Sequence, residues 1–210
     1  MALTSVKQRI VLCHPDTESL CSAIAKRWLV RAQGHHQECE VRDLYADGFD
    51  PVLKSNEQPG KQGYAPLEAN LAELEVLKAL DVLVFVYPIW FGSPPAMLKG
   101  YFERVVGCGN VVNTPGHTKP LAGVRLVSIC TSGARGVWLA EKGVTGALHT
   151  IFDQYVSEAF GSKKTYRLHL DSIDERTDDF FIRTRLADVD QFADQVCADA
   201  YGDVRGLSPS

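Results

Sequence analysis

The sequence predicts an α/β fold in which helices cover both faces of a doubly wound, parallel β-sheet. Segments typical of strands and of helices alternate about five times along the 210 residues. The central apolar run, residues 82–86, has the unbroken hydrophobicity of a strand that is covered on both faces. No internal repeat or linker divides the chain. We therefore expect one domain over residues 1–210, with residues 202–210 as a frayed tail.

The first predicted strand covers residues 9–13 and leads through a polar loop into a helix. Apolar residues of that helix recur at the spacing of one helical face, namely Leu20, Ile24 and Trp28. Gly34 is expected to end the helix, because glycine can adopt a positive φ. The second strand is expected at residues 40–44, with Val41 as its apolar member.

The middle of the chain starts with a long irregular connection, residues 47–66, rich in Gly, Pro, Asn and Gln. Connections of this length often form part of a functional site. A leucine stripe predicts a helix over residues 67–77, and the third strand follows at residues 81–88. After a further loop, a helix is expected over residues 95–106, since Pro95 is tolerated in a first turn.

The last third of the chain contains two more predicted strands, at residues 124–130 and 165–170. A helix is expected somewhere within residues 142–160. The final helix is expected at residues 178–201, and its apolar stripe consists of Leu186, Val189, Phe192, Ala193 and Val196.

The composition excludes several classes of partner. The net charge is -4 and the basic residues are dispersed, so nucleic acid is not expected as a partner. Residues 1–9 lack the apolar segment of a signal peptide, and no run approaches the roughly 20 apolar residues of a membrane helix. We expect a cytoplasmic protein without a membrane span.

The six cysteines form no CxxC pair, and two of them lie in strand-like apolar runs. Reduced thiols that serve as small apolar side chains fit this pattern best. A cluster of possible ligands, His35, His36, Glu38 and Cys39, matches no known metal-ligand spacing. No metal site is therefore expected.

In open α/β sheets, ligands bind beyond the carboxyl ends of the strands, where the strand order reverses. For a strand order of 2-1-3-4-5, which we assume here, this position lies between the first and third strands. Three loops would then converge there: residues 14–19, 88–94 and 131–136.

The first of these loops leads into the start of a helix, whose free N–H groups can bind a phosphate. His14 and Ser19 are candidates for further donors. Asp16, Thr17 and Ser19 could instead serve only to cap the helix. The residues alone leave both interpretations open.

The other two loops supply aromatic rings and glycines. Trp90 and Phe91 are adjacent and cannot both face one core, so at least one is a candidate wall for a flat ring. The TSGARG sequence of residues 131–136 could place backbone N–H groups close to a ligand oxygen. It is neither a Walker A loop nor a Rossmann fingerprint.

The run DVLVFVYPIWFGSPPAMLKGYFERVV, residues 81–106, resembles the signature of the flavodoxin-like NAD(P)H dehydrogenase (quinone) family. His14 and Pro15, with Ser19 after them, resemble the phosphate loop of that family, and residues 131–134 resemble its TTGG loop. The resemblance covers residues 9–136 and continues more weakly through residues 164–168. It implies a flavodoxin-like sheet of five strands in the order 2-1-3-4-5.

The resemblance also implies an enzyme that binds FMN, or possibly FAD, and that passes hydride from NADPH or NADH to a quinone-like acceptor by a ping-pong mechanism. His14, Ser19, Leu20 and Cys21 would then hold the flavin phosphate, Pro88, Ile89, Trp90 and Phe91 would line the isoalloxazine, and Thr131, Ser132, Gly133 and Ala134 would line its pyrimidine edge. A homodimer is expected from the exposed aromatics Trp90 and Trp138 and the helix at residues 95–106.

Some residues depart from the family pattern. Cys21 stands where Asn is frequent, and Ala134 replaces the second Gly. The Tyr and His that stabilise reduced flavin in the best-known members have no clear counterpart after Ala134, and the candidates are Arg135, Trp138 and His149.

Two other functions stay open at this point. Flavodoxin-like regulatory subunits of potassium efflux systems exist, and flavodoxins themselves are electron carriers. A carrier needs no nicotinamide pocket, so the aromatic pair and residues 47–66 favour an enzyme over a carrier.

Overall fold

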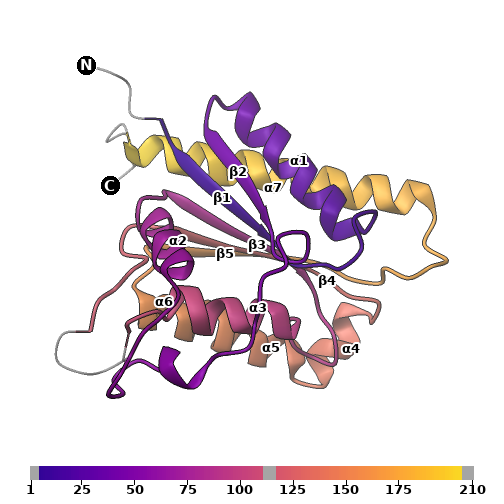
Figure 1. Cartoon of the computed structure of the whole chain (residues 1–210). Coiled ribbons are helices and arrows are strands. Elements are labelled where there is room, and N and C mark those ends of the chain that lie inside the picture. Colours follow the sequence, from indigo (N-terminus) through magenta and orange to yellow (C-terminus); the bar gives the residue numbers. More distant parts are fainter. Residues whose placement is uncertain (1–4, 111–116, 205–210) are drawn as a thin grey trace.

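The computed structural model describes residues 5–110 and 117–204, which contain a five-stranded parallel sheet in the order β2-β1-β3-β4-β5 (Figure 1). The strands are β1 (Lys7–Leu12), β2 (Glu38–Asp43), β3 (Val82–Pro88), β4 (Arg125–Thr131) and β5 (Lys164–Leu170). This order confirms the doubly wound, flavodoxin-like sheet expected from the sequence. Leu12 is in register with Val86, and Pro88 with Thr131, so the carboxyl ends of the central strands lie at one edge.

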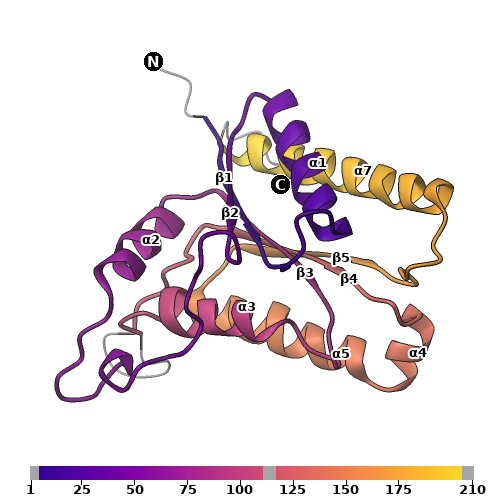
Figure 2. The ribbon, with the colours of Figure 1, turned by 45° about the vertical axis from the view of Figure 1, so that its right-hand side comes forward.

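Helices cover both faces of the sheet, as Figure 2 shows. On one face lie α1 (Leu20–Gly34) and α7 (Asp179–Val204). The other face carries α2 (Glu68–Lys78), α3 (Ala96–Tyr101), α4 (Gly136–Glu141), α5 (Val144–Leu148) and α6 (Val156–Phe160). Three short elements complete the chain: a 3₁₀ turn, η1 (Ser55–Glu57), and two π-helical stretches, η2 (Phe102–Val106) and η3 (His149–Tyr155).

The burial of the strands follows their place in the sheet. Every residue of β3 and of β4 is buried. β3 is the continuous apolar run predicted to be covered on both faces, whereas β4 also buries the polar residues Arg125, Ser128 and Thr131. β2 lies at the edge of the sheet, and Val41 is 41% exposed there. Val41 is therefore not a core residue, although it is an apolar member of its strand.

Other boundaries differ from the sequence-based expectation. α1 ends at Gly34 as expected, but the positive φ belongs to His36 (57°), two residues later. α4 was not expected: the helical path starts at Gly136 and is interrupted at Gly143, whose φ is 76°. α7 continues through residue 204, so residues 202–204 are helical, and residues 205–210 of the expected tail lie outside the described residues.

A buried carboxylate joins the strands β1 and β2 to the helices α2 and α3. Glu73, on α2, is 5% exposed. Its carboxylate accepts from Arg9 (2.9 Å), from Arg42 (2.7 Å) and from the Tyr101 hydroxyl (2.8 Å). Burial, followed by the Glu73 charge, raises the pKa of Tyr101, which keeps the phenol protonated as a donor. Glu73 thus links β1, β2 and α3.

We predict that Glu73→Ala lowers the free energy of unfolding by about 3 kcal/mol, because breaking a buried ion pair leaves its partners uncompensated. Urea denaturation measures the effect. Glu75→Ala, on the same helix, removes an exposed carboxylate paired with Lys78 and is expected to cost less than about 1 kcal/mol. Equal losses in the two variants would contradict the special place of Glu73.

Candidate functional site

A pocket of about 200 Å³ lies at the carboxyl edge of the sheet, where the three predicted loops meet. It is lined by His14, Leu20, Cys21, Pro88, Ile89, Trp90, Thr131, Ser132, Gly133 and Ile173. Three of the predicted site residues, Ser19, Phe91 and Ala134, are adjacent in sequence to lining residues but do not line the pocket. Ile173, which follows β5, was not expected from the sequence.

The first loop forms the N-terminal cap of α1. Ser19 is the capping residue, and its Oγ accepts from the backbone N–H of Ser22 at 3.2 Å. The backbone N–H groups of Leu20 and Cys21, in the first turn, donate to no acceptor among the described residues. The loop therefore caps the helix and still offers two free donors beside the pocket, which is the arrangement that binds anions.

His14 is the first residue of the same loop and lines the pocket. The backbone N–H of Asp16 donates to Nδ1 of His14 at 3.0 Å. In the neutral ring the proton is then on Nε2, which makes this nitrogen the available donor. The ring of His14 lies 5.7 Å from the ring of Trp90, measured between centroids. The first and second loops therefore share one wall of the pocket.

The second loop folds into a tight turn at the end of β3. Trp90 and Ser93 exchange backbone hydrogen bonds of 2.9 and 3.0 Å, and the two residues between them are left-handed, with φ of 50° at Phe91 and 78° at Gly92. Trp90 is 39% exposed and Phe91 is fully exposed. Neither ring belongs to the core, and a non-glycine residue held at positive φ is typical of a functional turn.

The third loop is attached to the ends of both neighbouring strands. The Ile89 N–H donates to the Thr131 carbonyl (2.7 Å), and the Ser132 N–H donates to the Leu170 carbonyl (3.0 Å). The N–H groups of Gly133 and Ala134 have no acceptor among the described residues. This loop thus adds a second pair of free backbone donors at the edge of the pocket.

Cys21 is the one thiol that lines the pocket. Its Sγ lies 3.5 Å from the Thr131 hydroxyl oxygen, and the side chain is buried. Burial raises the pKa of Cys21 to about 12, so the group is a thiol at neutral pH. Because the thiolate is the reactive form, Cys21 is not suited to act as a nucleophile.

The further charged and aromatic candidates lie away from the pocket lining. Arg135 is the exposed N-terminal cap of α4, and Trp138 on α4 is 51% exposed. His149 contacts the buried Asp153 carboxylate at 3.1 Å. His169, at the end of β5, was not expected from the sequence, and its imidazole contacts the pocket residue Ser132 at 2.8 Å.

The long connection of residues 47–66 also contributes no residue to the pocket. It is held against η2 by a buried ion pair in which Arg104 donates to Glu57 at 2.7 and 2.8 Å. Arg104 and Glu57 are 3% and 5% exposed. The expectation that this connection forms part of the site is therefore not supported at the pocket itself.

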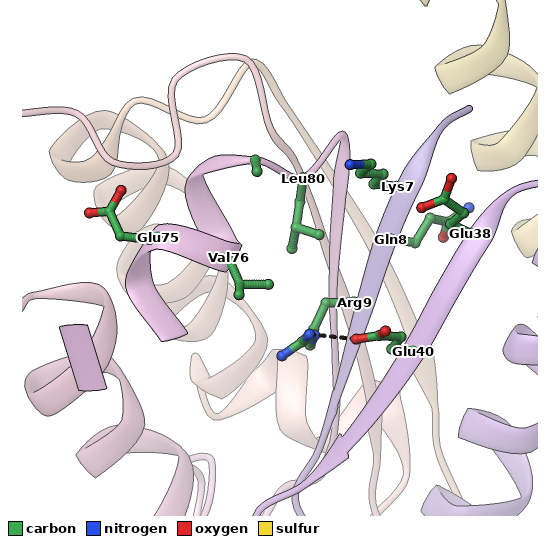
Figure 3. Close-up of a pocket in the computed structure, with 9 residues that line it drawn as sticks. Lys7, Gln8, Arg9, Glu38, Glu40, Glu75, Val76 and Leu80 are labelled. Carbon is green, nitrogen blue, oxygen red and sulfur yellow. Dashed lines mark hydrogen bonds and ion pairs between the residues drawn. The ribbon is translucent and has the colours of Figure 1, made fainter. Parts of the chain in front are cut away.

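A larger hollow of about 500 Å³ lies at the opposite, amino end of β1 and β2, beside α2 (Figure 3). Three of its charged groups are engaged in ion pairs: Arg9 contacts Glu40 at 2.6 Å, and Glu75 contacts Lys78, which does not line the hollow. Ligands of open parallel sheets bind at the carboxyl end. The smaller pocket, with its free donors and aromatic wall, is therefore the better candidate site.

The pocket brings together groups that suit a flat, phosphorylated ligand. Two pairs of backbone donors stand at α1 and at the third loop, and Trp90 and Pro88 offer apolar surface between them. The pocket lining contains no carboxylate. The described groups can bind an anion and hold a ring, and acid–base chemistry would depend on His14.

A protein-family model described as Flavodoxin-like fold matches residues 7–192. Among curated proteins, the chain is 36% identical over 124 residues to an uncharacterized NAD(P)H oxidoreductase of Escherichia coli, covering 57% of this chain and 62% of that protein. It is 27% identical over 161 residues to the NAD(P)H dehydrogenase [quinone] 1 of Rattus norvegicus, covering 68% and 59%. The chain thus spans about three fifths of the length of these relatives.

Solved structures share the fold at low identity. An NAD(P)H:quinone oxidoreductase from Methanothermobacter marburgensis superposes with a TM-score of 0.79 and 22% identity, covering 92% of this chain and 98% of that chain. An FMN-dependent NADH-azoreductase from Bacillus anthracis, in complex with FMN, has a TM-score of 0.69 and 16% identity, covering 91% and 99%. No helix among the described residues is long and apolar enough to cross a membrane.

Proposed function

The chain belongs to the protein family with the flavodoxin-like fold, and from this membership we propose that it is a flavin-dependent NAD(P)H oxidoreductase that reduces a quinone or a similar small acceptor. The observation that carries the proposal is the pocket at the switch in strand order, with its free donors and its aromatic wall. The names of the relatives, NAD(P)H oxidoreductase and NAD(P)H dehydrogenase [quinone], support the reaction class.

FMN is the flavin that fits the described residues best. The unpaired N–H groups of Leu20 and Cys21, together with the positive end of the α1 dipole, suit a terminal phosphate. Those of Gly133 and Ala134 suit the carbonyl oxygens of a pyrimidine ring. The FMN complex of the B. anthracis azoreductase supports the same choice.

In this proposal the protein binds and orients its cofactor, and the hard chemistry belongs to the flavin. A bound flavin supplies hydride transfer, accepting from NADH or NADPH and later reducing the acceptor. The N–H groups of Gly133 and Ala134 would stabilise negative charge at the ring edge, as an oxyanion hole does. Trp90 would cover the ring and limit access of water, and His14 Nε2 would be a further donor toward the flavin phosphate.

We further propose that a second copy of the chain completes the site. The pocket is smaller than the ~300–1,000 Å³ usual for ligand sites. Exposed apolar side chains lie on the second loop, Trp90 and Phe91, and on α4, which follows the third loop: Val137 and Trp138. Apolar patches of this kind usually bury against a partner, and a homodimer is the commonest solution.

The dimer is tested by sedimentation velocity at assay concentration. We expect a dimer for the native chain and a monomer for Val137→Asp, because a charge on the exposed face of α4 would have to be buried. Val30→Asp changes an equally exposed valine on α1 and should leave the dimer intact. A native chain that is monomeric and fully active would contradict the proposal.

The oxidoreductase is tested with the purified protein and added FMN. We expect tight FMN binding, loss of the yellow colour on anaerobic addition of NADH or NADPH, and its return with a quinone. An electron carrier would bind FMN without reduction by either nicotinamide. A regulatory subunit of a potassium efflux system would bind FMN but show no steady turnover with free quinone, and either result would overturn the proposed function.

The phosphate position is tested by Ser19→Asp. Asp caps a helix about as well as Ser, so the melting temperature of the FMN-free protein should not fall. A carboxylate at this position would stand beside the free donors and repel a phosphate. At an effective dielectric constant of about 20, like charges 4 Å apart repel by about 4 kcal/mol, which weakens FMN binding roughly a thousandfold.

The matched control is Ser19→Asn, which keeps a capping side chain without the charge and should retain FMN within about tenfold. The dissociation constant is measured by the quenching of FMN fluorescence. Unchanged affinity in Ser19→Asp would place the phosphate elsewhere and leave this loop with a capping role only.

A further inference from the structure

The third loop, which follows β4, is held by residues at the end of the neighbouring strand β5 and directly after it. The Ser132 Oγ lies 2.8 Å from Nε2 of His169 and 2.8 Å from the carbonyl oxygen of Ala134. The backbone N–H of Ile173 donates to the Ser132 carbonyl at 2.9 Å. At the far end of the loop, the Gly136 N–H donates to the Asp171 carboxylate. Residues 169–173 therefore grip the loop at both ends.

The direction of these hydrogen bonds follows from the count of protons. A serine hydroxyl has one hydrogen, and the Ala134 carbonyl can only accept. Ser132 must therefore donate to Ala134 and accept from His169, which places the proton of the neutral imidazole on Nε2. Burial lowers the pKa of His169, which keeps this neutral form at physiological pH.

This chain of hydrogen bonds spans the part of the loop that faces the pocket. Ser132 is 6% exposed and lines the pocket, and Ala134 is two residues further along. Between them lies Gly133, and the N–H groups of Gly133 and Ala134 are the free donors of this loop. Their direction is set by the backbone path that the Ser132–Ala134 hydrogen bond closes.

We infer that His169 is a positioning residue of the pocket: through its Nε2–H it fixes the Ser132 hydroxyl, and thereby the direction of the Gly133 and Ala134 N–H donors toward the bound flavin. The inference rests on the proposed function for the identity of the ligand. Without the imidazole donor, the Ser132 hydroxyl is free to turn away from Ala134, and the loop loses one of the hydrogen bonds that order it. His169 need not touch the ligand to act in this way.

The test uses two variants of similar size in the full-length chain. His169→Leu removes the donor, and His169→Gln keeps an N–H₂ group at a comparable reach. We expect the FMN dissociation constant to rise about tenfold in the leucine variant, the usual effect of losing one hydrogen bond, and to stay within about threefold in the glutamine variant. Comparable melting temperatures of the FMN-free variants would separate this effect from general loss of stability.

A double-mutant cycle with Ser132→Ala distinguishes positioning from mere packing. If His169 acts through the Ser132 hydroxyl, His169→Leu has no further effect on FMN affinity once that hydroxyl is gone. The inference would be overturned if the effects of the two substitutions on FMN affinity were additive. It would also be overturned if the leucine variant bound FMN like the native chain.

A second readout needs no flavin. Amide hydrogen exchange of the FMN-free protein should become at least several-fold faster across residues 131–136 in His169→Leu, and not in the first turn of α1. If the native chain binds no FMN, the proposed function fails, and exchange alone still decides whether His169 orders the loop. Unchanged exchange in residues 131–136 would overturn the inference on its own.

Discussion

The parallel pairing of β1 with β3 is the constraint on which the other features of this protein depend. Because parallel neighbours need crossover connections, α1 carries the chain to β2 and α2 carries it back past β1 to β3. The loops after β1 and β3 therefore leave the same edge in different directions and open a space between them. The registers of Leu12 with Val86 and of Thr131 with Pro88 and Leu170 bring the ends of all these strands to one level.

The sequence predicts this framework because the apolar composition of β3 and β4 indicates that both strands are buried. β3 is a continuous apolar run and β4 is mostly apolar, and such segments have few structural alternatives when helical stripes flank them. The prediction is weaker where the bounds of an element depend on the elements packed beside it. β2 starts at Glu38, before its apolar residue, because an edge strand is held by backbone pairing with β1 as much as by burial. α4 was not predicted because it is a short helix between two glycines and has no apolar stripe at helical spacing.

The candidate site also has parts that could be predicted from the sequence and parts that could not. Its loops could be predicted, since each follows a strand, and most of the expected residues line one pocket. His169 and Ile173 could not be found by motif. His169 reaches Ser132 across 37 residues of sequence, through the register of β4 with β5, and a sequence motif records no such contact. Free N–H groups were expected at the start of α1 and in residues 131–136, but the backbone path decides which residues carry them: Leu20, Cys21, Gly133 and Ala134.

Polar groups on the α2 face of the sheet are paired, whereas some at its carboxyl edge are free. Near the α2 face, Glu73 is satisfied by two arginines and a tyrosine, and Glu57 by Arg104. These buried charges stabilise the framework, and because they are already paired they are not available to bind a ligand. At the carboxyl edge, backbone N–H groups at the start of α1 and in the third loop have no acceptor among the described residues and stand beside exposed rings. They are therefore available to a ligand with a phosphate and a flat ring, while the paired charges elsewhere stabilise the framework that holds them in place.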